Sequence, residues 1–158
     1  MTTMIKNMLI IFAITLVSGL LLGGVYLLTK DTIAAADAEA VIAAYKQVFP
    51  DAVEFEEETL DGALAAQVLA EGGYSDTGIL NLQLAYDEQR SFMGCVFTVV
   101  SHNGYGGDIV MTVGIRNGGT INGIAFLEIS ETVGLGMKAE ELLAPQFTDK
   151  RLTNFELT

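Results

Sequence analysis

Two glycine-rich clusters are the part of this sequence best suited to binding chemistry. The first reads His-Asn-Gly-Tyr-Gly-Gly-Asp over residues 102–108, and the second reads Glu-Thr-Val-Gly-Leu-Gly-Met-Lys over residues 131–138. Glycine has no Cβ and adopts positive φ angles, so backbone N–H groups can converge on an oxygen-rich group. The second cluster also precedes a predicted helix, whose N-terminus carries a partial positive charge. These clusters predict a rim where the backbone can approach a flat or anionic ligand closely.

The other reactive residue types limit the chemistry of the chain. The sequence has one cysteine, Cys95, and one histidine, His102, which excludes an intramolecular disulfide and a multi-Cys or multi-His metal site. Cys95 lies in an apolar stretch, which favours a buried structural thiol over a reactive one. The sequence contains no Walker phosphate loop and no strand-linked Gly-x-Gly-x-x-Gly fingerprint. We therefore predict no catalytic residue and no metal ligand, and neither nucleotide hydrolysis nor dinucleotide binding.

The elements that would position the two clusters are strands. Apolar and polar residues alternate over residues 80–86, and β-branched residues are frequent in 92–100, 109–115 and 121–129. The last two runs are joined by Arg-Asn-Gly-Gly-Thr over 116–120, and Asn-Gly between apolar runs is a strong hairpin signal. Because a hairpin folds back on itself, its outer ends lie together. Both glycine clusters should therefore lie at one edge of the sheet.

A helix is predicted after the second cluster, because the apolar residues of 138–147 recur at helical spacing. Strands followed by a helix, with a hairpin at the centre, predict an α+β fold with an antiparallel sheet and flanking helices. The acidic run over residues 54–58 is expected to be a solvated connector.

The N-terminal segment predicts a transmembrane helix. No residue from 8 to 28 is charged, and Lys6 and Lys30 flank this apolar run. A helix of about 20 apolar residues spans a hydrocarbon core of roughly 30 Å. A cleaved signal peptide is the alternative, but its apolar region is only about 7–15 residues long, which favours a retained span. The two flanking lysines nearly balance, so the positive-inside rule leaves the orientation open.

Three segments are expected along the chain: an anchor over residues 1–30, a helical connector over 31–50 that ends at Pro50, and a domain over 51–158. All 20 acidic residues and six of the eight basic ones lie at or after residue 31, which gives that part a net charge of −14. Because nucleic-acid phosphates require a basic surface, we predict no nucleic-acid partner. The anchor predicts contact with the lipid bilayer.

The glycine clusters carry a family resemblance. Gly-Tyr-Gly-Gly, a strand ending in Val-Gly-Ile, an Asn-Gly hairpin, and Glu-Thr-x-Gly-Leu-Gly before a helix occur in this order over residues 92–147. This arrangement resembles the FMN-binding domain shared by the G subunit of Rnf complexes and the C subunit of the sodium-pumping NADH:quinone reductase. The short anchor favours the Rnf member. Val133 stands where the family commonly has Pro, and Ile129-Ser130 where it often has a His before the Glu.

The resemblance implies bound FMN and assigns its site to both clusters. The cofactor-binding residues that it implies are Tyr105, Gly106, Gly107, Glu131, Thr132, Gly134, Leu135, Gly136 and Lys138. The residues themselves also allow structural roles: packing for Tyr105, capping or turn formation for Glu131 and Thr132, and simple solvation for Lys138.

The resemblance also implies a covalent flavin. Family members attach FMN through a phosphoester to the hydroxyl of a Thr or Ser in a Ser-Gly-Ala-Thr-like motif. The nearest match here, Asp61-Gly62-Ala63-Leu64, has Leu64 where the acceptor hydroxyl is needed. We therefore expect the domain to be truncated at its C-terminus, and the attachment residue to lie beyond Thr158.

The function implied is that of an electron-transfer subunit of a multi-subunit oxidoreductase. FMN would relay electrons in a complex that couples ferredoxin and NAD to the movement of Na⁺ or H⁺. The implied partners are other membrane and electron-transfer subunits, and the implied location is the cell membrane, with the domain outside the cytoplasm. Two alternatives stay open: an anchored ligand-binding or assembly module without flavin, and a stand-alone flavoprotein reductase.

Overall fold

A computed structural model describes residues 2–132 and 136–154 of the chain. The chain divides into two compact units, Met1–Glu39 and Ala40–Thr158. The described residues of the first unit are all helical and belong to α1 (Thr2–Val48). The second unit contains the last residues of α1 and the sheet that follows.

The first unit is long and apolar enough to cross a membrane, by length and composition. Large side chains such as Leu9, Phe12 and Leu22 are exposed along it, and a hydrocarbon core would remove them from water. The hydroxyl groups of Thr15 and Thr29 donate to backbone carbonyl oxygens of the same helix. Thr15 Oγ1 donates to the carbonyl oxygen of Ile11 at 3.0 Å, so this polar side chain needs no external partner in lipid.

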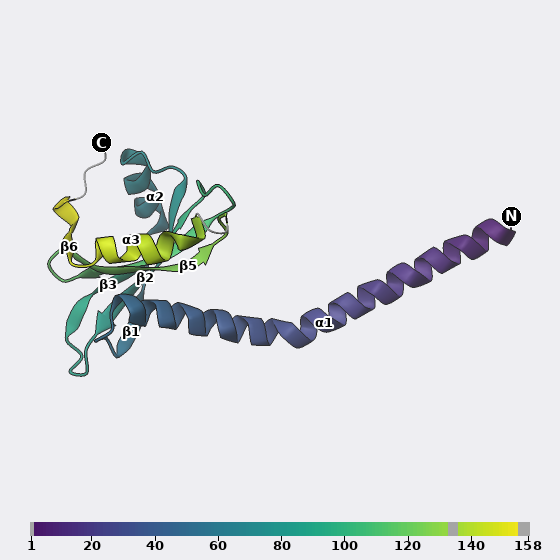
Figure 1. The fold of residues 1–158 in the computed structure, drawn as a ribbon. Helices are drawn as coiled ribbons and strands as arrows, with labels where there is room; N and C mark the ends of the chain where they lie inside the picture. The colour runs from purple at the N-terminus through teal and green to yellow at the C-terminus, as the bar shows by residue number, and fades with distance from the viewer. Residues whose placement is uncertain (1, 133–135, 155–158) are drawn as a thin grey trace. The chain divides into compact units, whose positions relative to one another are not determined.

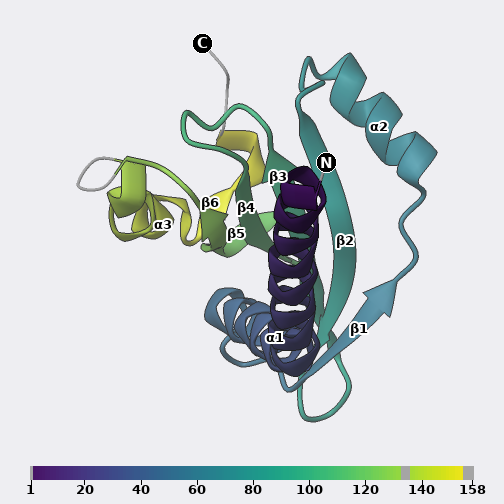
Figure 2. The same ribbon diagram turned by 90° about the vertical axis from the view of Figure 1, so that its right-hand side faces the viewer.

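The second unit is built on one antiparallel sheet in which each strand pairs with the next along the chain (Figure 1). Its strands are β1 (Glu54–Glu58), β2 (Thr77–Tyr86), β3 (Phe92–Ser101), β4 (Ile109–Arg116), β5 (Thr120–Ile129) and β6 (Lys150–Arg151). Helix α2 (Gly62–Glu71) contacts β2 and helix α3 (Ala139–Phe147) contacts β5, at opposite sides of the sheet (Figure 2). Short 3-10 turns precede α3 (Gly136–Lys138) and follow β6 (Leu152–Asn154). The predicted α+β fold is confirmed.

The predicted central hairpin is also confirmed. Arg116 pairs with Thr120 at the turn, and Ile109 pairs with Ile129 at the open end of β4 and β5. The turn needs glycine, because Gly118 and Gly119 have φ angles of 130° and 76°, where other L-residues are strained.

The acidic run over residues 54–58 was expected to be a connector, and this prediction was wrong. The run forms β1, which pairs with β2 from Glu54↔Tyr86 to Glu58↔Leu82. The ring of Phe55 lies 5.4 Å from that of Tyr45, centroid to centroid, so one apolar side chain fixes the strand on the core. Local composition concealed the strand, because four of its five residues are acidic and the residues that pair with them lie 24 to 32 positions further along the chain.

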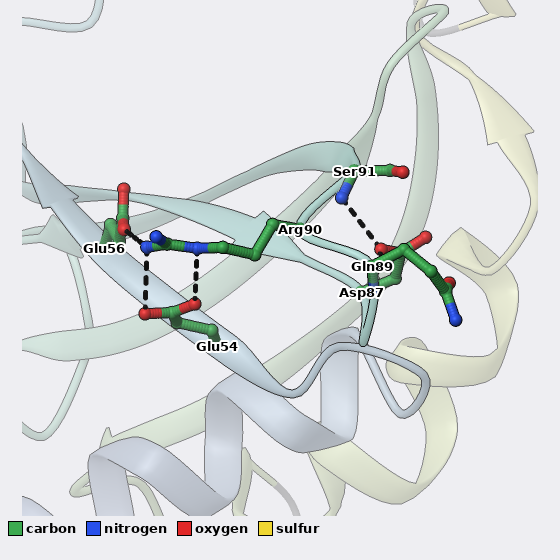
Figure 3. A network of polar contacts seen from close by, with 6 residues as sticks. All are labelled: Glu54, Glu56, Asp87, Gln89, Arg90 and Ser91. Carbon is green, nitrogen blue, oxygen red and sulfur yellow. Dashed lines mark hydrogen bonds and ion pairs between the residues drawn. The ribbon is translucent and has the colours of Figure 1, made fainter.

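Arg90 partly neutralises this acidic strand (Figure 3). It lies in the β2–β3 turn with a φ of 57°, and its Nε donates to Glu54 at 3.1 Å while its Nη2 contacts both Glu54 and Glu56. Asp87 forms the turn by accepting from the backbone N–H of Gln89 at 2.9 Å and of Ser91 at 2.8 Å. The turn therefore places one cation between two carboxylates that would otherwise repel each other.

The core of the second unit lies between the end of α1 and one face of the sheet. Val48 and Phe49 are each 1% exposed, and the strands leave room for them by carrying glycine. A Cβ at Gly114 would lie 3.0 Å from Val48 Cβ and 3.1 Å from the Phe49 ring, and a Cβ at Gly94 would lie 2.9 Å from the same ring. Pro50 follows Phe49 and, having no N–H, ends the helical hydrogen bonding.

Replacing Phe49 with Ala should lower the free energy of unfolding by about 3–5 kcal/mol, because a fully buried ring is removed and a cavity remains. Denaturant unfolding of the full chain in detergent measures the change. Leu80→Ala is the control, because Leu80 is 57% exposed and should cost only about 0.5 kcal/mol. Equal losses for the two variants would show that the Phe49 contact does not stabilise the domain.

Candidate functional site

The two glycine clusters meet in space. The first glycine loop (residues 102–108) connects β3 to β4, and the second glycine loop (residues 131–138) follows β5. Because β4 and β5 are paired as far as Ile109↔Ile129, the loops leave the same end of the hairpin. The sequence-based expectation that they share one edge of the sheet is confirmed.

A carboxylate joins the two loops. Glu131 Oε1 accepts hydrogen bonds from the backbone N–H groups of Tyr105 at 2.7 Å and Gly106 at 3.4 Å. Successive N–H groups that converge on one anionic oxygen form the kind of concavity that binds anions in proteins. In this structure the chain's own carboxylate occupies it.

The glycines in these loops allow the backbones to approach each other. A Cβ at Gly106 would lie 1.8 Å from the carbonyl oxygen of Ser130, and a Cβ at Gly136 would lie 2.4 Å from Glu131 Cβ. Within the first loop, a Cβ at Gly104 would lie 2.1 Å from the carbonyl oxygen of Gly107. Loop-to-loop packing is therefore one physical reason for glycine at these positions.

The base of the first loop is held by side chains that the sequence analysis did not assign to the site. His102 Nδ1 lies 2.9 Å from Asp108 Oδ1, so the loop's two end residues contact each other. The backbone N–H of His102 donates to the carbonyl oxygen of Asp76 at 2.9 Å, which ties the loop to the residue before β2. The sequence signal for this contact was a histidine and an aspartate six residues apart, on either side of three glycines.

Tyr105, Thr132 and Lys138, which were also predicted to belong to the site, are exposed. Tyr105 is 93% exposed, so its ring is free of the packing role that was the alternative. Lys138 is exposed at the start of α3 and makes no side-chain capping hydrogen bond. The carbonyl oxygen of Thr132 accepts from the N–H of Met137 at 3.4 Å, across the second loop. Predicted site residues Gly134 and Leu135 lie outside the described residues, as does Val133.

The stretch nearest to an attachment motif has a structural role. Asp61 is the N-cap of α2, and its Oδ1 accepts from the N–H groups of Ala63 at 3.0 Å and Leu64 at 3.2 Å. This helix was not predicted, although an aspartate before an alanine-rich run is an N-cap signal. Asp61-Gly62-Ala63-Leu64 therefore starts a helix, and Leu64 offers no hydroxyl.

An antiparallel sheet with flanking helices and two joined glycine loops, following a helix of membrane-spanning length, defines a membrane-anchored domain of the FMN-binding type. Family models match both parts. Residues 1–48 match the RnfG N-terminal region, which coincides with α1, and residues 104–156 match the FMN-binding domain, which includes most of the first glycine loop and all of the second.

Three curated relatives, all of them G subunits, agree with these matches. The chain is 28% identical over 142 residues to that of the Na(+)-translocating ferredoxin:NAD(+) oxidoreductase complex of Acetobacterium woodii, covering 90% of this chain and 68% of the relative. The chain is 30% identical over 138 residues to the G subunit of the ion-translocating oxidoreductase complex of Haemophilus influenzae. This alignment covers 83% of the chain and 60% of the relative. For the Vibrio cholerae G subunit the identity is 29% over 142 residues, and the alignment covers 89% of the chain and 65% of the relative.

The two family matches and the curated relatives together support an RnfG identity for the chain, that of the G subunits of Rnf-type complexes. The chain spans between 60% and 68% of the length of the three relatives. The resemblance stated from the glycine clusters and the anchor is thereby confirmed.

Gly106→Ala should destabilise the joined loops, because the new methyl group would meet backbone at Ser130. We expect a loss of about 1–3 kcal/mol, typical of overpacking, measured by denaturant unfolding or as a lower melting temperature. Gly62→Ala is the matched control, since no atom lies within 4 Å of its added Cβ and it begins a helix, where alanine is favoured. If both variants had the same stability, the close approach at Ser130 would have no energetic importance.

Proposed function

We propose that the chain is a membrane-anchored flavoprotein subunit that relays electrons through FMN in an Rnf-type complex. The observation that carries this proposal is the pair of family matches in their order: the RnfG N-terminal region on α1, then the FMN-binding domain on both glycine loops. By analogy with the relatives' names, the complex would be an ion-translocating oxidoreductase, coupling ferredoxin:NAD electron transfer to Na⁺ or H⁺ translocation.

The described residues fit a flavin at the glycine loops. Tyr105 presents an exposed ring, which suits stacking on a flat heterocycle or bordering it. Lys138 presents an ammonium group near the start of α3, where the helix dipole also favours an anion. Bound FMN would supply reversible electron acceptance, while the chain's residues would position and shield it. The proposed binding residues are Tyr105, Gly106, Gly107, Glu131, Thr132, Gly134, Leu135, Gly136 and Lys138.

We propose further that the flavin is covalent, through a phosphoester to a Thr or Ser hydroxyl. The Asp61–Leu64 stretch is not the acceptor, because its fourth residue has no hydroxyl and its first caps α2. In this proposal the protein acts with other membrane and electron-transfer subunits and has no substrate pocket of its own. Its domain lies outside the cytoplasm.

The flavin proposal predicts different effects for two glycine replacements in the full-length protein. Gly136→Val should lower flavin fluorescence per folded protein, because overpacking against Glu131, which typically costs about 1–3 kcal/mol, would disturb the loop that positions FMN. Gly118→Val should reduce stability but leave flavin occupancy unchanged, because β4 separates this turn from the loops by about 25 Å.

Flavin absorbance that survives denaturation of the wild-type protein is the accompanying measurement. Its presence establishes the covalent link, and a wild-type protein without any flavin would favour the anchored assembly module instead. Equal occupancy in the Gly118→Val and Gly136→Val proteins would remove the basis for placing the site at residues 131–138.

The proposed location predicts accessibility of β1 from outside the cell. Glu57 is exposed, so a Glu57→Cys variant should react with a membrane-impermeant maleimide in intact cells. The background variant Cys95→Ala removes the native thiol, which is half-buried and whose pKa is raised by that burial. Labelling that required permeabilised membranes would place the domain on the cytoplasmic side.

A further inference from the structure

The side chain of Glu131 links segments of the domain that are distant in sequence. Its Oε1 atom accepts from the N–H groups of Tyr105 and Gly106, which lie 26 and 25 residues earlier. A carboxylate makes shorter and stronger hydrogen bonds to backbone N–H groups than a neutral acceptor does. One side chain of the second glycine loop therefore fixes two consecutive peptide units of the first.

Both loops leave space for this side chain. The missing Cβ of Gly136 would lie 2.4 Å from Glu131 Cβ and 3.3 Å from Oε2, and that of Gly104 would lie 3.1 Å from Oε1. The carboxylate of Glu131 thus lies between two glycines, one from each loop. A side chain at either position would push it away from the N–H groups that it accepts from.

We infer that Glu131, counted above among the proposed binding residues, acts as a positioning residue. It holds the first glycine loop in the conformation that receives the flavin and does not itself contact the flavin. The inference rests on the proposed function for the identity of the ligand. Oε1 of Glu131 already accepts hydrogen bonds from two N–H groups of the first loop, so both lone pairs of this oxygen are used there. Fixing the N–H of Tyr105 also fixes the backbone from which its exposed ring projects.

Three variants of the full chain in detergent test the hydrogen bonds themselves. Glu131→Ala removes the acceptor, and Glu131→Gln keeps a neutral oxygen at nearly the same position. Glu128→Ala is the matched control, because it removes the same charge from an exposed site on neighbouring β5. Amide hydrogen exchange at Tyr105 and Gly106 is measured in the absence of flavin. Glu131→Ala should accelerate it about 10- to 100-fold, the loss expected for a hydrogen bond to a charged acceptor, with a smaller effect for Gln.

The second measurement reports on the flavin environment in the same variants of the full-length protein. Iodide quenching of FMN fluorescence should rise in the Glu131→Ala protein toward that of free FMN, because the loop no longer shields the ring. The Glu131→Gln protein should keep most of the wild-type protection of FMN from iodide. The Glu128→Ala protein should keep all of it. A purely structural role would change thermal stability while leaving the quenching of bound flavin as in the wild type.

The outcomes separate this inference from the proposed function. Unchanged exchange at Tyr105 and Gly106 in the Glu131→Ala protein would show that the carboxylate does not hold the loop. Faster exchange with unchanged flavin quenching would overturn the positioning role. A wild-type full-length protein that carries no flavin would overturn the proposed function. The exchange result needs no flavin and would stand by itself.

Discussion

The second unit depends on a region of the sheet without side chains, on which the end of α1 packs. Gly94, Gly114 and Gly123 come from three neighbouring strands, and a Cβ at any of them would contact Val48 or Phe49. Among the described residues these two are the largest fully buried side chains. The end of the helix that begins in the apolar segment, with the residue after it, therefore supplies the largest side chains of the domain's core. Steric room at three glycines is thus what allows helix and sheet to share one core.

The sheet in turn determines the site through the register of one hairpin. Pairing of β4 with β5 carries both glycine loops to the same end, where they are close enough for their backbones to touch at Gly106 and Ser130. Glycine acts differently in the two places. In the core it makes room for apolar side chains of a helix, and in the loops it allows backbone and the Glu131 carboxylate to approach each other.

Acidic residues in this domain do more than give it a strong negative charge. Asp61 caps α2, Asp87 organises the β2–β3 turn, and Glu131 joins the glycine loops, each by accepting hydrogen bonds from backbone N–H groups. Such groups have no partner within a regular element, and a carboxylate satisfies them well. In β1 the acidic residues have a different environment, where cross-strand pairing and Arg90 offset their mutual repulsion.

The sequence alone determined those features whose signals are local. The apolar, uncharged residues 8–28 indicated the helix of the first unit, alternation indicated β2, and Asn117-Gly118 indicated the central hairpin. These signals are readable because hydropathy period and turn chemistry act over a few residues. The family resemblance was equally readable from the order of the glycine motifs. The tertiary structure decided that residues 54–58 form a strand and that Phe49 is a core residue. It also decided that the Glu131 carboxylate faces Tyr105 and Gly106. Each of these depends on a partner about 25 or more residues away, and such a partner becomes defined only when the strands pair and bring the distant segments together.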